Sequence, residues 1–230
     1  QALYLMTASK KGISAHQLHR ILEVTYKTAW FMAHRIREAM RSGELAPFGS
    51  GGGFVEVDET FIGRRKGVPV GMGYEHKMKV LSLLDRDSGR TRMMTVDKIS
   101  VASLTPILIE NIAAEANLLT DDAGQYRHMH RHFASHATTA HTKGRYVDRE
   151  NPTIHTNTIE GSFSIFKRGM KGVYQHCGER HLHRYLAEFE FRYSYRAANG
   201  FDDGERTQQA MRGIVGKRLT YRTANLEGCA

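Results

Sequence analysis

Residues 1–41 place hydrophobic side chains at helical spacing. Ser14 and Thr25 each stand just before such a stretch and can cap a helix by accepting its first free N–H groups. The second stretch, "YKTAWFMAHRIREAM", has an apolar side made of Ala29, Met32, Ala33, Ile36 and Met40. Its polar positions are Lys27, His34, Arg35 and Arg37. The pattern predicts two short helices joined by a tight turn.

Two interpretations of this helix pair differ in what the second helix contacts. A helix-turn-helix would lay it on DNA, with Lys27 and Arg35 among the contacts. An ordinary helical hairpin would pack it on the rest of the protein instead. We favour the DNA contact because the second helix is basic and the turn is short.

The hydrophobic pattern changes after a linker rich in Gly, Ser and Pro, "SGELAPFGSGGG". Predicted strands then cover "FVEVDETFIG", a hairpin that turns at "DRDSG", "NLLTDD" and a stretch around "SHATTAHT". Predicted helices cover residues 100–116, 123–134, 157–171 and 179–197. We therefore divide the chain into a helix-turn-helix-like segment (1–41), the linker (42–53), a mixed domain (54–222) and a tail (223–230).

The order of these elements, β-β-β-α-β-α-β-α-α, determines the predicted fold class. It is the order of an RNase H-like α/β fold, in which a mixed sheet is flanked by helices. In such a fold the first strand, the end of the fourth strand and the start of a late helix meet at one edge of the sheet. Side chains far apart in the sequence can therefore form one site there.

Composition narrows the range of partners. The formal net charge of +9 favours a polyanion, most simply nucleic acid. The most apolar region, "LTPILIENIAAEANLL", is interrupted by Glu and Asn, so we expect no membrane span. The two cysteines, Cys177 and Cys229, stand far apart, which argues against a disulfide scaffold and suits a reducing cytoplasm.

Three carboxylates occupy the positions that the fold would bring together. Asp58 lies in the first strand, Asp121 ends the fourth, and Glu160 begins a late helix. Phosphoryl transfer on nucleic acid uses such a cluster to hold two Mg²⁺ or Mn²⁺ ions about 4 Å apart. Each residue also has an ordinary explanation: a polar strand position beside Glu56, a helix cap, or a first-turn acid that complements the helix dipole. Position alone leaves both explanations open.

Four longer motifs carry a family resemblance: "VEVDETFIG", "LLTDDAGQY", "IHTNTIEGSFSIFKRGMKGVYQH" and "HLHRYLAEFEFRYSYR". Together they resemble the transposase domain of the bacterial ISXO2-like insertion-sequence transposases, members of the DDE superfamily. The resemblance implies an RNase H-like fold and Mg²⁺- or Mn²⁺-dependent DNA cleavage and strand transfer. It places the first two acids on Asp58 and Asp121, with Tyr126 as the tyrosine that follows the second.

The third acidic position has two candidates under this resemblance. Glu160 has Lys167 seven residues later, which is the usual superfamily spacing between this acid and a lysine. Some branches of the family have Asn in the third place, and Asn157 stands one helical turn before Glu160. We predict Glu160 as the ligand and retain Asn157 as an alternative ligand or phosphate contact.

The helix that carries Glu160 has two distinct stripes. The polar stripe is formed by Asn157, Glu160, Ser164, Lys167 and Lys171. The apolar stripe, which we expect to face the core, is formed by Ile159, Phe163, Phe166 and Met170. Lys167 and Lys171 are candidate phosphate contacts, although a solvated basic face would look the same. His155 could contact the scissile phosphate or cap the preceding loop.

These observations predict a DNA transposase that acts on double-stranded DNA, namely the terminal repeats of an element and its target. We expect it to work as a homo-oligomer, a dimer on DNA, in the bacterial cytoplasm at the nucleoid. Two other functions remain possible from the sequence. One is a catalytically inactive or domesticated DNA-binding protein, and the other is a stand-alone nuclease of the same fold.

Overall fold

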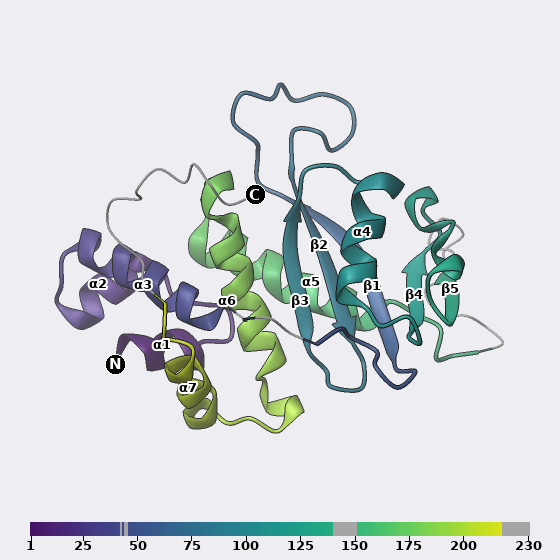
Figure 1. The fold of residues 1–230 in the computed structure, drawn as a ribbon. Coiled ribbons are helices and arrows are strands. Elements are labelled where there is room, and N and C mark those ends of the chain that lie inside the picture. The colour runs from purple at the N-terminus through teal and green to yellow at the C-terminus, as the bar shows by residue number, and fades with distance from the viewer. Residues whose placement is uncertain (42, 44–45, 140–150, 218–230) are drawn as a thin grey trace.

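A five-stranded mixed sheet forms the centre of the molecule in the computed structural model, which describes residues 1–41, 43, 46–139 and 151–217 (Figure 1). Its strands are β1 (Phe54–Ile62), β2 (Met78–Asp85), β3 (Thr91–Val96), β4 (Asn117–Asp121) and β5 (Ser135–Thr139). They lie in the order β3-β2-β1-β4-β5. The β1–β2 and β2–β3 pairs are antiparallel, and the β1–β4 and β4–β5 pairs are parallel. This order and orientation confirm the predicted RNase H-like α/β fold.

Helices cover both faces of the sheet. Helix α4 (Val101–Asn111) packs on one face over Val55, Val57 and neighbouring apolar residues of β2. Helices α5 (Asn157–Gly169) and α6 (Leu182–Ser194) cover the other face. Strand β2 is buried at seven successive positions, so its sequence is mostly apolar and does not alternate, although Lys79 and Ser82 are among the buried residues. Alternation along β1 turns Glu56 and Asp58 toward the α5 face.

A third hydrophobic cluster joins the two ends of the chain. Helices α1 (Ala2–Ala8) and α3 (Tyr26–Met40) lie beside α7 (Asp203–Arg212), α3 also packs on α6, and α2 (Ala15–Leu22) packs on α3 (Figure 1). Met6, Leu18 and Ala33 from the first helices contact Phe191 and Ala210 from the last two. The hydrogen bonds Gln17 N–Ser14 Oγ (3.2 Å) and Thr28 N–Thr25 Oγ1 (3.2 Å) confirm both predicted caps.

Two polar positions expected on α3 are in fact buried. His34 and Arg37 are 1% and 2% exposed, respectively. Arg37 Nε lies 2.7 Å from Glu188 Oε2 on α6, and its guanidinium lies over the Tyr185 ring. A buried arginine is tolerated when it is paired in this way, and the helical pattern alone does not reveal such a partner.

Other boundaries also differ from the sequence prediction. The helix predicted over 100–116 ends at Asn111, because Ile112 forms a parallel bridge with Phe48. The helix predicted over 123–134 is wrong: two 3₁₀ turns stand there, Gly124–Tyr126 and Met129–Arg131. Tyr126 and Met129 are drawn into the core under α4, which breaks a regular helix.

The last part of the mixed domain is close to the prediction. Helix α5 continues as a π-helical turn, Met170–Tyr174, and α6 is preceded by a 3₁₀ turn, Glu179–His181. A further 3₁₀ turn spans Ala197–Asn199. Strand β5 confirms the start of the strand predicted around "SHATTAHT", whose last residues lie outside the described part of the chain, as do the tail 223–230 and residues 218–222. Among the described residues, no helix is long and apolar enough to cross a membrane.

Candidate active site

Asp58 and Asp121 lie on neighbouring parallel strands. The register pairs Val55 with Leu118 and Glu56 with Leu119. Two further residues along this register, Asp58 stands beside Asp121. Both side chains therefore point to the face that α5 covers, and both are half-buried.

Glu160 reaches the same region from the first turn of α5. It lines a groove of about 750 Å³ together with Asp58, Thr60 and the basic residues Lys167 and Lys171. The polar stripe of α5 thus forms one wall of the groove. The apolar stripe Ile159, Phe163, Phe166 and Met170 is buried against the sheet and α6, as the sequence predicts.

The carboxylates influence one another electrostatically. The pKa of Asp58 is raised to about 7, mainly by burial and further by the charges of Glu59, Asp121 and Glu160. A hydrogen bond from the Glu59 N–H to Asp58 Oδ1 (2.7 Å) opposes this shift. A cation between these groups would remove the repulsion and favour the charged carboxylate.

The donor chemistry of this region suits a hard divalent ion. Asp58, Asp121 and Glu160 offer carboxylate oxygens, which Mg²⁺ and Mn²⁺ prefer. In the described part of the chain, however, no group of three or more His, Cys, Asp or Glu side chains stands close enough to form a metal-binding cluster. The fit of this region to Mg²⁺ or Mn²⁺ therefore rests on the carboxylate chemistry of the three residues, on their position at the α5 face of the sheet, and on the effect of their charges on the pKa of Asp58.

Glu59 is a site residue that sequence reasoning missed. It points to the opposite side of β1 from Asp58, where it accepts hydrogen bonds from Tyr126 Oη (2.5 Å) and Gln125 Nε2 (3.2 Å). Burial raises the pKa of Glu59 and that of the Tyr126 hydroxyl. This contact fastens the segment after Asp121 to the strand of Asp58. The signal available in the sequence was an acid next to Asp58 and a tyrosine shortly after Asp121.

Glu56 fixes the helix that carries Glu160. It is fully buried, and its Oε2 accepts the Ile159 N–H at 2.8 Å in the first turn of α5. Its Oε1 lies 2.6 Å from Arg86 Nε. Since Thr156, the residue at the N-cap of α5, makes no side-chain capping bond, Glu56 supplies the missing acceptor from the sheet.

His155 and Asn157 lie outside the groove lining. His155 Nδ1 is 2.8 Å from Arg86 Nη2 and 3.6 Å from Glu56 Oε1. Burial, with the positive charge of Arg86, lowers the pKa of His155, so its ring is neutral near pH 7. Asn157 is exposed at the first position of α5, whereas Glu160 lines the groove. Of the two candidates for the third position, Glu160 lines the groove and Asn157 does not.

The candidate DNA contacts on α3 stand apart from this groove. Lys27 and Arg35 are exposed. Helix α3 packs on α6, which lies between α3 and the sheet (Figure 1). Any DNA contact through α3 would therefore involve a second region of the molecule.

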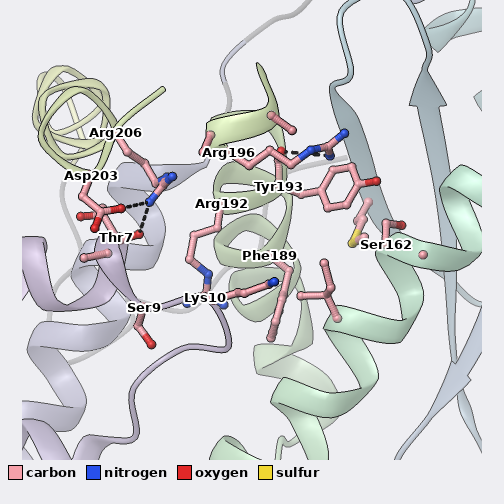
Figure 2. A pocket seen from close by; sticks show the side chains of 16 residues that line it. Thr7, Ser9, Lys10, Ser162, Phe189, Arg192, Tyr193, Arg196, Asp203 and Arg206 are labelled. Atoms are coloured by element: carbon pink, nitrogen blue, oxygen red, sulfur yellow. Dashed lines mark hydrogen bonds and ion pairs between the residues drawn. The ribbon is translucent and has the colours of Figure 1, made fainter. Parts of the chain in front are cut away.

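A separate cavity of about 550 Å³ lies between α1, α5, α6 and α7 (Figure 2). Arg206 Nη1 bonds to Asp203 Oδ1 (2.6 Å) and to the Thr7 carbonyl (3.2 Å), which ties α7 to α1. The guanidinium of Arg196 stacks on the Tyr193 ring at 3.8 Å. Because Arg206 already ties α7 to α1 across this cavity, we interpret the cavity as a gap between packed helices.

One family of known proteins matches this chain over more than half of its length. The model of the family described as the ISXO2-like transposase domain matches residues 51–194. No curated protein matches the chain. Among solved structures, a simian T-cell lymphotropic virus intasome in complex with PP2A regulatory subunit B56 gamma is similar at 15% identity and a TM-score of 0.37, over 75% of this chain and 67% of that chain.

Proposed function

Because the chain belongs to the ISXO2-like transposase domain family, we propose that it is a DDE-type DNA transposase. It would hydrolyse a phosphodiester at the end of a mobile element and free a 3′-OH. That hydroxyl would then attack a phosphodiester of the target DNA, forming a new P–O bond as the target strand breaks. The observation that carries the proposal is the groove that Asp58 lines together with Glu160, Lys167 and Lys171 of α5, with the charge of Asp121 close enough to act on Asp58.

Asp58, Asp121 and Glu160 would hold the divalent metal, Mg²⁺ or Mn²⁺, as a pair of ions. When bound, the metal supplies Lewis acidity at the phosphate and activates the attacking oxygen. Lys167 and Lys171 would contact the backbone phosphates of the strand being cut. Glu56 would act as a positioning residue, because it orients the first turn of α5 on which Glu160 stands.

The partner under this proposal is double-stranded DNA, both the terminal repeats of the element and its target. The net charge of +9 supports a polyanionic partner. Lys27 and Arg35 on the exposed side of α3 are candidate contacts for the repeats. Joining two ends to one target requires two active sites, so we propose a homodimer on DNA.

The test is a cleavage and strand-transfer assay on DNA that carries the element ends, with and without Mg²⁺. We expect Asp58→Asn and Glu160→Gln each to reduce both reactions roughly a hundredfold or more. The matched control is Glu110→Gln, at an exposed acid on α4. Undiminished activity in either site variant would refute the assignment of that residue.

The same assay separates the two alternative functions. Binding of the element ends without Mg²⁺-dependent cleavage would indicate a non-catalytic DNA-binding protein. Cleavage without joining would indicate a nuclease. A comparison of Asn157→Ala with Glu160→Gln then decides which side chain serves as the third ligand, since the ligand variant should require a higher Mg²⁺ concentration.

A further inference from the structure

The loop of residues 63–77 extends beyond the sheet between β1 and β2, at the top of the view in Figure 1. It begins where β1 ends, after the strand has passed Asp58. Its neck also lies at the far end of α5, because Ile62 and Met78 pack with Met170 of the π-helical turn. The strand and the helix that carry the acids thus both lead away from them toward this loop.

The neck of the loop is anchored. The Arg65 N–H donates to the His76 carbonyl at 2.8 Å across the neck. The Tyr74 ring stacks on Phe61 of β1 at 4.2 Å, with 15° between the planes. Arg65 Nε lies 2.9 Å from Glu179 Oε1 in the turn before α6. These contacts hold the loop as a projecting arm, so binding through it would cost less ordering entropy than a free chain would.

The arm combines positive charge next to its neck with bare apolar side chains at its tip. Val70 is 63% exposed and Met72 is fully exposed. Arg64 and Lys66 are also exposed, and within the described residues neither forms an ion pair. The one acid of the loop, Glu75, is engaged by Lys79 at 2.8 Å. The arm therefore presents two cations next to its neck and an apolar wedge at its tip.

This combination fits duplex DNA better than a protein surface. Proteins that distort DNA insert Met, Pro or aliphatic side chains between base steps while cations hold the adjacent phosphates. An apolar protein partner would gain nothing from the two unpaired cations. The position fits as well, since Lys167 and Lys171 line the path from Glu160 toward the neck.

The distance from the acids to the neck can be estimated along both elements. From Glu160 to Lys171 the helix rises about 16 Å at 1.5 Å per residue. From Asp58 to Gly63 the strand rises about 16 Å at 3.3 Å per residue. Both paths correspond to about five base pairs at 3.4 Å each.

We propose that residues 63–77 form a DNA-distorting arm. Arg64 and Lys66, next to the neck, hold backbone phosphates about five base pairs from the scissile phosphate, and Val70 and Met72, at the tip, wedge against a base step beyond that point. This inference rests on the proposed transposase function, because it places the DNA by its cut end in the groove. The ligand is the duplex itself, contacted without regard to base identity.

The test places 2-aminopurine, one step at a time, five to twelve base pairs from the cleaved end of a duplex. The full chain is added with Ca²⁺ in place of Mg²⁺, so that binding is measured apart from cleavage. We expect a fluorescence rise at one or two adjacent steps beyond the fifth pair. The double variant Val70→Ser/Met72→Ser should lose this rise while its affinity falls less than about threefold. The matched control is Met211→Ser on α7, also an exposed methionine, which should keep the rise.

The cations are tested by the salt dependence of affinity. Arg64→Gln/Lys66→Gln should bind about tenfold more weakly at moderate salt. The slope of log K against log salt should also become shallower by roughly two, since each phosphate contact contributes about 0.9. The matched control is Arg212→Gln on α7, with an expected slope equal to that of the wild type.

Three outcomes would contradict the proposal that residues 63–77 form a DNA-distorting arm. The tip variant could keep the fluorescence rise, the cation variant could keep the full salt slope, or the variants could alter only self-association in sedimentation, which would make the loop a contact between copies. Failure of the proposed function is distinguishable. The fluorescence rise should persist in Asp58→Asn. If the wild type distorts the duplex but never cleaves it, the proposed transposase function is wrong and the proposed arm still stands. If the wild type cleaves the duplex without distorting it, only the proposed arm is wrong.

Discussion

His34 shows how a single buried side chain makes the stability of this protein depend on pH. Its ring lies between Trp30 (centroids 4.1 Å apart) and Tyr185 (5.7 Å), and within the described chain neither ring nitrogen has a hydrogen-bond partner. Burial, together with the charges of Arg37, His181, Arg184 and His183, lowers the pKa of His34 to about 3. The native ring is therefore neutral, whereas the unfolded ring takes up a proton below about pH 6.5.

We predict that this histidine destabilises the native state in mild acid. Between pH 6.5 and 3 the unfolded chain binds the extra proton, so stability is lost as the pH falls. His34→Phe should remove the part of this acid-induced loss of stability that comes from His34. Relative to the wild type, its free energy of unfolding should therefore rise by up to about 1.4 kcal/mol for each pH unit below 6.5. Urea unfolding at pH 7.5, 6.5 and 5.5 measures the difference. The exposed His128→Asn is the control, and a constant difference between wild type and His34→Phe across the three pH values would contradict the prediction.

At the residue scale, the sequence predicted candidate site residues that stand in motifs, but it did not predict contacts that form only when the chain folds. Asp58, Asp121 and Glu160 were predicted as site residues from their place in the motifs. Glu56 and Glu59 flank Asp58 in the same strand, but their partners are Ile159 and Tyr126, about a hundred and about seventy residues away. No local pattern reveals which buried carboxylate will receive which distant donor.

At the element scale, the position of α5 depends on one acceptor in the sheet. Because Glu56 takes both the Ile159 N–H and the Arg86 guanidinium, it connects β1, the segment after β2 and the start of α5. We predict that Glu56→Ala lowers the free energy of unfolding by about 2–4 kcal/mol, since it removes the buried acceptor of the Ile159 N–H and the carboxylate partner of the half-buried Arg86. Ser14→Ala, which removes an ordinary helix cap, should cost only about 1 kcal/mol.

A variant that keeps the shape of Glu56 separates positioning from stability. Glu56→Gln retains an oxygen for the Ile159 N–H but loses the charge that holds Arg86. Under the proposed function we expect strand cleavage to fall in Glu56→Gln even at temperatures where the variant remains folded. Unchanged cleavage together with unchanged unfolding would show that Glu56 does not position α5.

The elements that the sequence predicted well are those whose structure follows from their own hydrophobic pattern and turn residues. The hairpin of β2 and β3 turns at Asp85–Gly89 as predicted, and the apolar stripe of α5 faces the core. The helix predicted over 123–134 failed because Tyr126 and Met129 are held by α4 and by Glu59. Tertiary contacts of this kind override a weak helical period.

For the whole molecule, α6 is the element that joins the sheet to the N-terminal helices. Phe189 belongs to the cluster beneath the sheet, and Phe191 belongs to the cluster with α1, α2 and α3. The buried pair of Arg37 and Glu188 also crosses from α3 to α6. The linker "SGELAPFGSGGG" suggested a separable N-terminal segment. A Gly-rich stretch can mark a boundary between two parts of a sequence, but it does not show whether those two parts pack against each other.

We therefore predict that the N-terminal helices and the sheet unfold as one cooperative unit. Leu18 on α2 and Leu118 on β4 are both fully buried, but in different clusters. Leu18→Ala and Leu118→Ala should each cost about 2–5 kcal/mol and shift the same single transition in calorimetry. The half-buried Leu22→Ala on α2 should cost less. Two resolved transitions, each moved by only one of the substitutions, would instead mean that residues 1–41 fold independently and that α6 does not couple them to the sheet.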